Sequence, residues 1–178
     1  NELDGVISLG VGEPDFKTPF AIREEGIRTL ENGKTWYSAN AGLMELRTEI
    51  SRYLERRFDI SYNPKDEVLV TVGGSEAIDL CLRALVNPGE EVLIPEPSFV
   101  CYTPLVELIG AVPVPIETKA ENQFRLTKQD LLDKITDKTK VLVLPYPNNP
   151  TGGVMRREHL EEIAEVLRER DIVVMSDE

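Results

Sequence analysis

The sequence has 178 residues, of which 41% are hydrophobic, so it is long and apolar enough to bury the core of one domain. Its formal net charge is −12 at pH 7. This acidic balance argues against nucleic acid and anionic membrane surfaces as main partners, because both attract basic surfaces.

The two cysteines and the two ends of the sequence give further expectations. Cys81 and Cys101 lack the spacing of a zinc site or of a disulfide framework, so we expect reduced, buried thiols in a cytoplasmic protein. No apolar run is long enough to cross a membrane. The sequence begins at Asn1 rather than at a methionine and stops at Glu178 directly after a strand-like run. We therefore expect a segment of a longer protein.

Residues 1–63 form the first of two regions that the sequence predicts. They hold an opening rich in glycine and proline, two expected helices over residues 20–31 and 43–58, and a polar loop over residues 33–42 between these helices. The opening and the loop contain the turn-forming residues that separate helices from one another.

Residues 64–178 form the second predicted region, in which strand-like and helix-like runs alternate. Strands are expected over residues 68–72, 91–94, 112–116, 140–144 and 172–175. Helices are expected over residues 76–86, 99–109, 127–135 and 158–170. The short helix has a capped start at Thr127 and Asp130. Two prolines in the run 112–116 predict an edge strand, since proline cannot donate to a sheet ladder.

This alternation predicts an α/β fold with a mostly parallel sheet and helices on both faces, present here in incomplete form. Ligands of such sheets bind beyond the carboxyl ends of the strands. Three segments follow strand ends, and we expect them to meet at one edge: Gly73-Gly74-Ser75, Asn148-Asn149 and Ser176-Asp177.

The first of these segments, in the stretch TVGGSEA, joins a strand to a helix. Gly74 and Ser75 would let backbone N–H groups at a helix N-terminus approach an oxyanion such as phosphate. The same residues also suit a tight turn with a helix cap. The stretch is neither a P-loop nor a dinucleotide fingerprint, which disfavours a plain nucleotide-binding domain.

Three side chains near the other strand ends complete a candidate site. Asp177, at the end of an apolar strand, would need a cation or a strong donor if buried, or else it is a surface turn residue. Asn149 suits binding of a phenolate oxygen or a carboxylate, or else it belongs to an ordinary Asn-Pro turn. Phe99 could cover a flat ligand or belong to the core. Together with the Gly-Gly-Ser turn, these residues fit a planar, phosphorylated heterocycle with one basic ring nitrogen, and no metal site is expected.

Five ordered motifs along the whole chain resemble the class I/II aminotransferases, which are pyridoxal-phosphate enzymes of fold type I. The motifs are SLGVGEPDFKTP, GKTWYSANAGLMELR, VTVGGSEAI, NNPTGG and SDE. The resemblance implies transfer of an amino group between an amino acid and a 2-oxo acid, with pyridoxal 5′-phosphate as the cofactor.

The resemblance also assigns residue roles. It implies that Gly12 presents its backbone N–H to the substrate carboxylate, and that Tyr37 reaches across a homodimer interface to the cofactor phosphate of the neighbouring subunit. Gly74 and Ser75, with the Glu76 backbone, are implied to bind the phosphate.

For the remaining site residues, the resemblance implies contacts with the cofactor ring. Phe99 is implied to stack on the pyridine ring, and Asp177 to pair with the protonated ring nitrogen. Asn149 is implied to donate to the ring 3-oxygen and to lie in the substrate site. The resemblance further predicts a cis peptide bond between Asn149 and Pro150.

One departure from the family pattern is decisive for activity. The family uses a lysine that forms a Schiff base with the cofactor, in a segment well after the SDE motif. None of the eight lysines here, at positions 17, 34, 65, 119, 128, 134, 138 and 140, has that context. We therefore expect no catalytic residue in this chain, and we expect the segment alone to be inactive and the activity to belong to the parent protein.

Two other functions remain open on the sequence. One is a pyridoxal-phosphate-dependent carbon–sulfur lyase or synthase of the same fold, because the motifs present serve the cofactor and the substrate carboxylate in all of these enzymes. The other is a non-catalytic, aminotransferase-like sensing domain of a transcription regulator, which a DNA-binding region before Asn1 would indicate.

Overall fold

The computed structural model describes residue 12 and residues 14–178; the start of the SLGVGEPDFKTP motif lies outside the described residues. The chain divides into two compact units, Asn1–Val68 and Leu69–Glu178. No helix in the described part of the chain is both long enough and apolar enough to cross a membrane.

The first unit contains two helices, α1 (Phe20–Glu31) and α2 (Met44–Phe58), which confirm the predicted ones. α2 ends at Asp59, which adopts a left-handed conformation with φ of 56°. The guanidinium of Arg47 is buried and its Nη1 donates to two backbone carbonyls, those of Pro64 and Lys65, at 3.0 Å each. This side chain therefore ties α2 to the loop that follows it.

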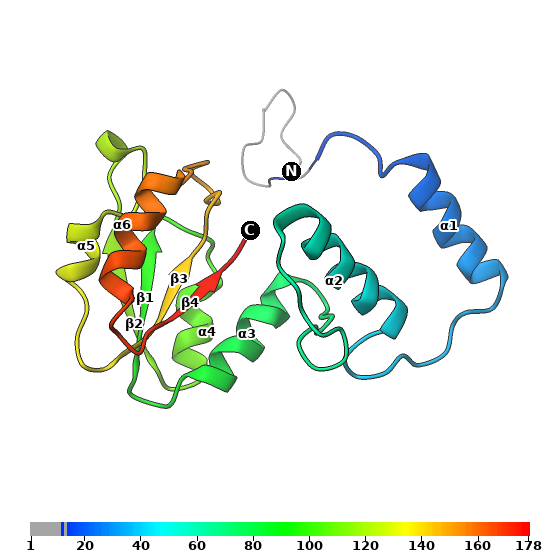
Figure 1. Cartoon of the computed structure of the whole chain (residues 1–178), viewed down its shortest axis with the longest axis horizontal. Helices are drawn as coiled ribbons and strands as arrows, with labels where there is room; N and C mark the ends of the chain where they lie inside the picture. Colours follow the sequence, from blue (N-terminus) through cyan, green and yellow to red (C-terminus); the bar gives the residue numbers. More distant parts are fainter. Residues whose placement is uncertain (1–11, 13) are drawn as a thin grey trace, which may run out of the picture. The chain divides into compact units, whose positions relative to one another are not determined.

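The second unit is built on a four-stranded parallel sheet (Figure 1). Its strands are β1 (Glu91–Glu96), β2 (Val112–Glu117), β3 (Thr139–Leu144) and β4 (Val173–Ser176), in the order β2-β1-β3-β4. Its helices are α3 (Gly74–Leu85), α4 (Tyr102–Leu108), α5 (Lys128–Leu132) and α6 (Arg157–Leu167), with one 3-10 turn, η1 (Ala120–Asn122). The predicted α/β fold with a parallel sheet is confirmed.

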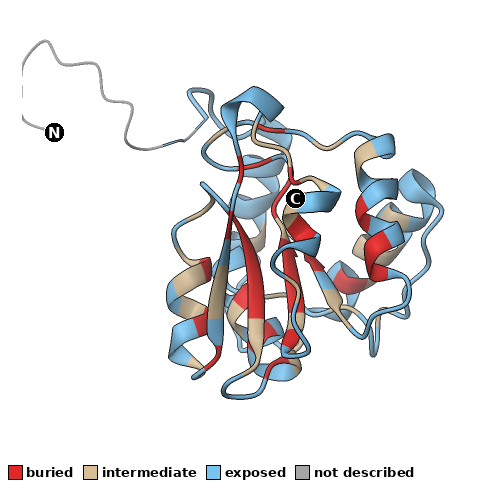
Figure 2. Ribbon diagram, turned by 90° about the vertical axis from the view of Figure 1, so that its left-hand side faces the viewer, coloured by how far each residue is buried: buried red, intermediate tan, exposed pale blue. Residues whose placement is uncertain are grey.

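Helices cover both faces of this sheet. Alternate residues of each strand point to opposite sides and so contact different helices. Figure 2 shows the buried residues concentrated along the central strands. One face packs on α3 and α4 through the buried residues Ile78, Leu82, Val86, Val92, Ile94, Tyr102, Val106, Ala111, Val141, Val143 and Met175. The other packs on α5 and α6 through Leu93, Ile116, Leu126, Leu131, Leu142, Tyr146, Ile163, Val166 and Leu167.

Two local predictions are confirmed by this arrangement. β2, which contains Pro113 and Pro115, lies at an edge of the sheet, where a missing N–H donor breaks no ladder on the outer side. α5 begins with the predicted capping box, in which the Thr127 side chain accepts from the Asp130 N–H and the Asp130 side chain accepts from the Thr127 N–H. These contacts satisfy two N–H groups at the helix start.

Two local predictions are wrong. Residues 68–72 form no strand: Leu69 is 54% exposed and Val72 is 90% exposed, since no segment in the described part of the chain pairs with them. A β-prone run becomes a strand only when a neighbour completes its hydrogen bonds.

The second error concerns the thiols, which were predicted to be buried. Cys81 is exposed on α3 and Cys101 is only partly buried; both are free.

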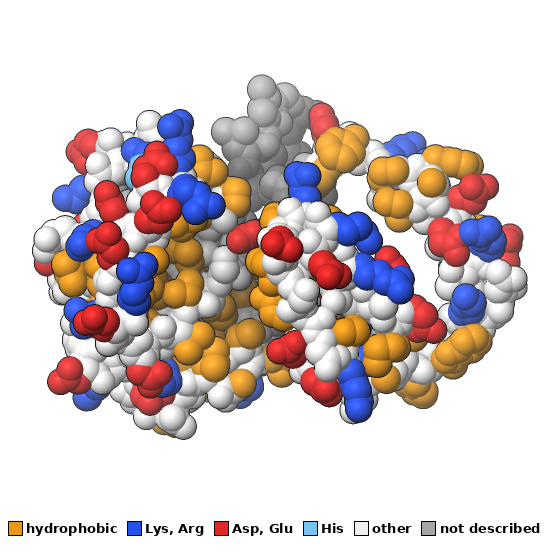
Figure 3. All heavy atoms as spheres, viewed as in Figure 1, with side chains coloured by type: hydrophobic (Ala, Val, Ile, Leu, Met, Phe, Trp, Pro, Cys, Tyr) orange, Lys and Arg blue, Asp and Glu red, His pale blue; other side chains and the backbone are white. Residues whose placement is uncertain are grey.

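Charged side chains of both signs are intermingled over α5 and α6 (Figure 3). Two ion pairs are found there, Lys128 with Glu165 at 3.1 Å and Arg157 with Glu161 at 3.4 Å. All four side chains are well exposed, so each pair contributes little to stability. The fold is therefore held by the two apolar layers rather than by its surface charges.

Candidate functional site

Two of the three predicted site segments lie at observed strand ends: Asn148-Asn149 comes after β3, and Ser176-Asp177 lies at the end of β4. The third, Gly73-Gly74-Ser75, follows residues 68–72, which form no strand, and opens α3 instead. β3 and β4 are paired up to Leu144 and Ser176, and the Asp177 N–H donates to the Leu144 carbonyl at 3.2 Å. Asp177 therefore continues the ladder by one residue. The backbone of this residue is fixed by the sheet, and only its side-chain torsions remain to be set.

The turn before α3 leaves the helix N-terminus open. Gly73 has φ of 82°, a conformation that favours glycine, and its position as the helix cap supplies no side chain to the first N–H groups. The Glu76 carboxylate turns back to accept the Val72 N–H. Gly74 and Ser75 are exposed, so their backbone groups at the positive end of a twelve-residue helix can reach an anion.

Asp177 is half-buried and accepts a hydrogen bond from a tyrosine. The Tyr102 hydroxyl donates to Asp177 Oδ2 at 2.5 Å. Burial raises the pKa of Tyr102 well above its usual range, and the hydrogen bond with Asp177 and the negative charge of that residue raise it further. The hydroxyl thus keeps its proton and remains a donor to the carboxylate.

Phe99 lies beside this pair. Its ring centroid is 6.0 Å from that of Tyr102, with the two rings nearly perpendicular at 85°. Phe99 is partly buried against the α3–α4 face of the core and also lines a cavity of about 770 Å³. The predicted helix over residues 99–109 begins later, at Tyr102, because residues 100 and 101 form the turn that leads into α4.

Cys101, directly before Tyr102, has a thiol whose pKa depends on both Ser75 and Asp177. Burial raises the pKa of its thiol, a hydrogen bond with the Ser75 side chain opposes this shift, and the Asp177 charge adds to it. The start of α3 and the end of β4, about a hundred residues apart in the sequence, both influence the pKa of this thiol.

The loop after β3 is organised by Asn148, which sequence reasoning left without a role. Asn148 is buried; its N–H donates to the Gly153 carbonyl at 2.8 Å and its carbonyl accepts the Gly152 N–H at 2.8 Å. Its Oδ1 also accepts the Thr151 hydroxyl at 3.1 Å. Asn149 is left exposed at the loop tip, and the Asn149–Pro150 bond is cis, as predicted.

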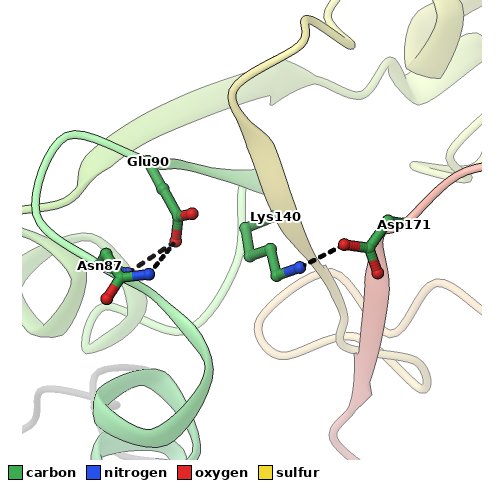
Figure 4. A network of polar contacts seen from close by, with 4 residues as sticks. All are labelled: Asn87, Glu90, Lys140 and Asp171. Carbon is green, nitrogen blue, oxygen red and sulfur yellow. Dashed lines mark hydrogen bonds and ion pairs between the residues drawn. The ribbon is translucent and has the colours of Figure 1, made fainter.

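The opposite edge of the sheet, at the amino ends of the strands, carries a different set of charges (Figure 4). Lys140 Nζ lies 2.6 Å from Asp171 Oδ2, and Glu90 accepts from the Asn87 backbone at 2.7 Å and from its side chain at 3.3 Å. The hydrogen bond with Asp171 raises the pKa of Lys140. A lysine held protonated in this way is a poor nucleophile.

Two predicted site residues belong to the other unit. Gly12 and Tyr37 are both exposed, and Tyr37 is 101% exposed. Their roles toward the cofactor remain predictions. In the described residues no group of three or more acidic, histidine or cysteine side chains is placed to hold a metal ion.

The fold and this edge define a class of protein. The family model described as aminotransferase class I and II matches residues 4–178. The chain therefore belongs to the class I and II aminotransferase family.

Among curated proteins, the chain is 54% identical over 176 residues to the putative aminotransferase YugH of Bacillus subtilis, covering 99% of this chain and 46% of the relative. It is 47% identical over 176 residues to an aspartate aminotransferase of Pyrococcus abyssi, covering 99% and 45%. The chain thus spans a little under half the length of these relatives.

Solved structures show the same similarity. The aromatic aminotransferase of Pyrococcus horikoshii superposes with a TM-score of 0.93 at 45% identity, over 98% of this chain and 47% of that one. The aspartate aminotransferase of Thermus thermophilus with maleate gives a TM-score of 0.88 at 38% identity, over 93% of this chain and 43% of that one. The fold is therefore that of part of an aminotransferase.

Proposed function

We propose that this chain is the part of a pyridoxal-phosphate-dependent aminotransferase that binds most of the cofactor, and that the complete protein transfers an amino group between an amino acid and a 2-oxo acid. The observation that carries this proposal is the Asp177 carboxylate held at the end of β4, where its N–H donates to the Leu144 carbonyl and its Oδ2 accepts from the Tyr102 hydroxyl at 2.5 Å. An anion-binding helix start and a fixed carboxylate at one sheet edge suit the two ends of this cofactor.

The phosphate end fits the start of α3. The helix has no side-chain cap, so the N–H groups of its first turn are available to phosphate oxygens. A Cβ built on Gly74 would meet no atom within 4 Å, so the approach to this backbone is open. Gly74, Ser75 and the Glu76 backbone would hold the phosphate, and the Ser75 hydroxyl would add one donor.

The ring end fits the residues around Asp177. When bound, pyridoxal phosphate supplies an electron sink for the substrate α-carbon. Asp177 places a fixed negative charge where the ring nitrogen would carry its proton. Phe99 offers an aromatic face for stacking, and the exposed amide of Asn149 can donate to the ring oxygen and contact substrate.

We propose that the Schiff-base lysine is supplied from outside residues 1–178. Two lysines of this chain are held by carboxylates, Lys140 by Asp171 and Lys128 by Glu165. The chain also spans only 46% of the relative YugH, which leaves room for the lysine in the remainder of the parent protein. The 178-residue segment alone should then be inactive.

Substrate class and assembly are part of the same proposal. Relatives named as aspartate and aromatic-amino-acid aminotransferases make aspartate and aromatic amino acids the first donors to test.

The full exposure of Tyr37 supports its place in a homodimer contact, since a large apolar side chain gains from being covered. Two free cysteines favour the reducing cytoplasm.

The experiment uses the complete protein that carries this chain, purified with pyridoxal phosphate. L-aspartate and L-phenylalanine are offered in turn with 2-oxoglutarate, and L-glutamate formation is measured. We expect glutamate from at least one donor, and no glutamate when 2-oxoglutarate is omitted. Cleavage of a cysteine conjugate with release of thiol and no need for a 2-oxo acid would instead identify a carbon–sulfur lyase. Cofactor binding without turnover of any donor would overturn the enzymatic proposal.

A further inference from the structure

Tyr102, at the first position of α4, joins the core of the second unit to the candidate site. Its side chain is only 2% exposed, yet its hydroxyl lies 2.5 Å from Oδ2 of Asp177, a residue 75 positions later in the sequence. Sequence motifs did not single it out. A buried tyrosine hydroxyl requires a polar partner, and here the partner is a carboxylate predicted to bind the cofactor.

The ring of Tyr102 is held in place by its surroundings. It belongs to the apolar cluster formed by α3, α4 and one face of the sheet, together with central strand residues such as Val92 and Val143. Phe99 packs against it edge to face. Because a close-packed side chain cannot change rotamer without opening a void, the hydroxyl occupies one fixed position.

This fixed donor determines how Asp177 is oriented. The Asp177 backbone is already paired to Leu144 through its N–H, so the side-chain torsions are what remain free. A hydrogen bond to Oδ2 selects one orientation of the carboxylate and leaves Oδ1 available to a second donor. A hydrogen bond to an ionised acceptor is stronger than one between neutral groups. This orientation of the Asp177 carboxylate is therefore strongly preferred.

We propose that Tyr102 is a positioning residue, which holds the Asp177 carboxylate so that its other oxygen receives the protonated ring nitrogen of pyridoxal phosphate. This inference rests on the proposed function. Tyr102 also contacts Phe99, so a single buried ring sets both the residue that faces the ring nitrogen and the residue that stacks on the ring. Tyr102 itself touches no reacting atom and acts through these two neighbours.

The test compares Tyr102→Phe with Tyr146→Phe in the complete protein. Both tyrosines are buried, but Tyr146 packs on the opposite face of the sheet, where its hydroxyl donates to the Phe124 carbonyl at 2.9 Å and accepts the Leu126 N–H at 3.0 Å. Each variant removes one oxygen and keeps the ring, so the packing is preserved. Thermal unfolding of both variants checks that they fold.

The probe is 4′-deoxypyridoxine 5′-phosphate, which has the ring nitrogen, the 3-oxygen and the phosphate but no aldehyde. Its affinity, measured by calorimetry, therefore reports non-covalent contacts alone and does not depend on activity. We expect Tyr102→Phe to weaken binding about ten-fold, the size expected for one hydrogen bond to a charged group. Tyr146→Phe should bind the probe as the wild type does.

A double-mutant cycle with Asp177→Asn separates positioning from packing. If Tyr102 acts through the carboxylate, Tyr102→Phe should have little further effect once Asp177 has been replaced. An unchanged affinity of Tyr102→Phe, or an equal loss with and without Asp177, would overturn the inference. Wild-type protein that fails to bind the probe would instead overturn the proposed function itself.

Discussion

The two edges of the parallel sheet in the second unit carry charged residues in different ways. At the amino edge, Lys140 and Asp171 form an ion pair in which Asp171 is 93% exposed. At the carboxyl edge, Asp177 is half-buried and its partner is a neutral tyrosine from the core. The charges of Lys140 and Asp171 therefore match one another, whereas the Asp177 charge is oriented but has no cation among the partners found for it.

This difference shows where a ligand is accommodated. A carboxylate with a matched cation needs nothing further, and an exposed pair adds little to stability. A carboxylate held by a neutral donor keeps its full charge, which suits a cationic group that arrives with a ligand. The uncapped start of α3 suits the negative end of the same ligand.

The largest effect is expected from removing the charge at the carboxyl edge. Asp177→Asn in the complete protein should lower kcat/KM for amino transfer by about 100-fold or more, because a fixed charge opposite the ring nitrogen is lost. Asp171→Asn is the matched control at the amino edge and should leave kcat/KM unchanged. Equal losses in the two variants, measured by steady-state kinetics, would show that the two edges are not functionally distinct.

A smaller effect is expected at Asn148, which organises the loop after β3. Asn148→Ala should lower the free energy of unfolding by about 1–3 kcal/mol, because the Thr151 hydroxyl and N–H lose their acceptor in a partly buried place. Asn87→Ala, at the opposite edge, should cost less, since the Asn87 side chain bond to Glu90 is exposed. Urea denaturation compares the two, and a larger loss for Asn87→Ala would contradict the account.

Each face of the sheet buries a tyrosine, and alkaline pH provides a test of the one on the α5–α6 face, Tyr146. Burial raises the pKa of Tyr146 from 10.0 to about 12, while the hydrogen bond from the Leu126 N–H opposes the shift. The folded state thus holds the phenol proton more tightly than the unfolded state does. The resulting stabilisation is complete below pH 10 and is lost as the pH rises towards 12.

We therefore expect wild-type protein to lose stability relative to Tyr146→Phe as the pH rises above 10. Urea denaturation of both proteins at pH 8 and pH 11 measures this difference. A gap between the two free energies of unfolding that does not change with pH would contradict the assignment of a raised pKa to Tyr146.

The smallest effect is expected from the amino-edge ion pair. Asp171→Asn should change the free energy of unfolding by less than about 1 kcal/mol, because the carboxylate is almost fully in solvent. The change should shrink further at high salt, since exposed charges are screened. A loss of several kcal/mol that is insensitive to salt would mean that this edge is more strongly coupled to the core than its exposure indicates.

Much of the fold follows from local patterns in the sequence. The helix over Arg157–Leu167 was predictable because Ile163 and Leu167 repeat on one apolar face, and the strand ends followed from short apolar runs. The run 68–72 was predicted wrongly because its composition favours a strand, but a strand also needs a neighbour, which composition does not encode.

The candidate site was predictable only in part. The rule that ligands bind beyond parallel strand ends selected Ser75, Asn149 and Asp177; Asn149 and Asp177 follow observed strands, whereas Ser75 follows residues 68–72, which form no strand. Tyr102 was missed, and Asn148 was placed at this edge without a role, because their roles depend on side-chain hydrogen bonds that only the packed chain forms. The one available signal for Tyr102 was a polar-tipped aromatic in an apolar helix, three positions after Phe99.

We propose that the carboxyl edge of the sheet binds both ends of one cofactor. A crystal structure of the complete protein with pyridoxal phosphate tests this most directly. We expect the phosphate at the backbone N–H groups of Gly74 and Ser75, and the ring nitrogen within hydrogen-bonding distance of the Asp177 carboxylate. A phosphate bound elsewhere, or a ring nitrogen turned away from Asp177, would contradict it.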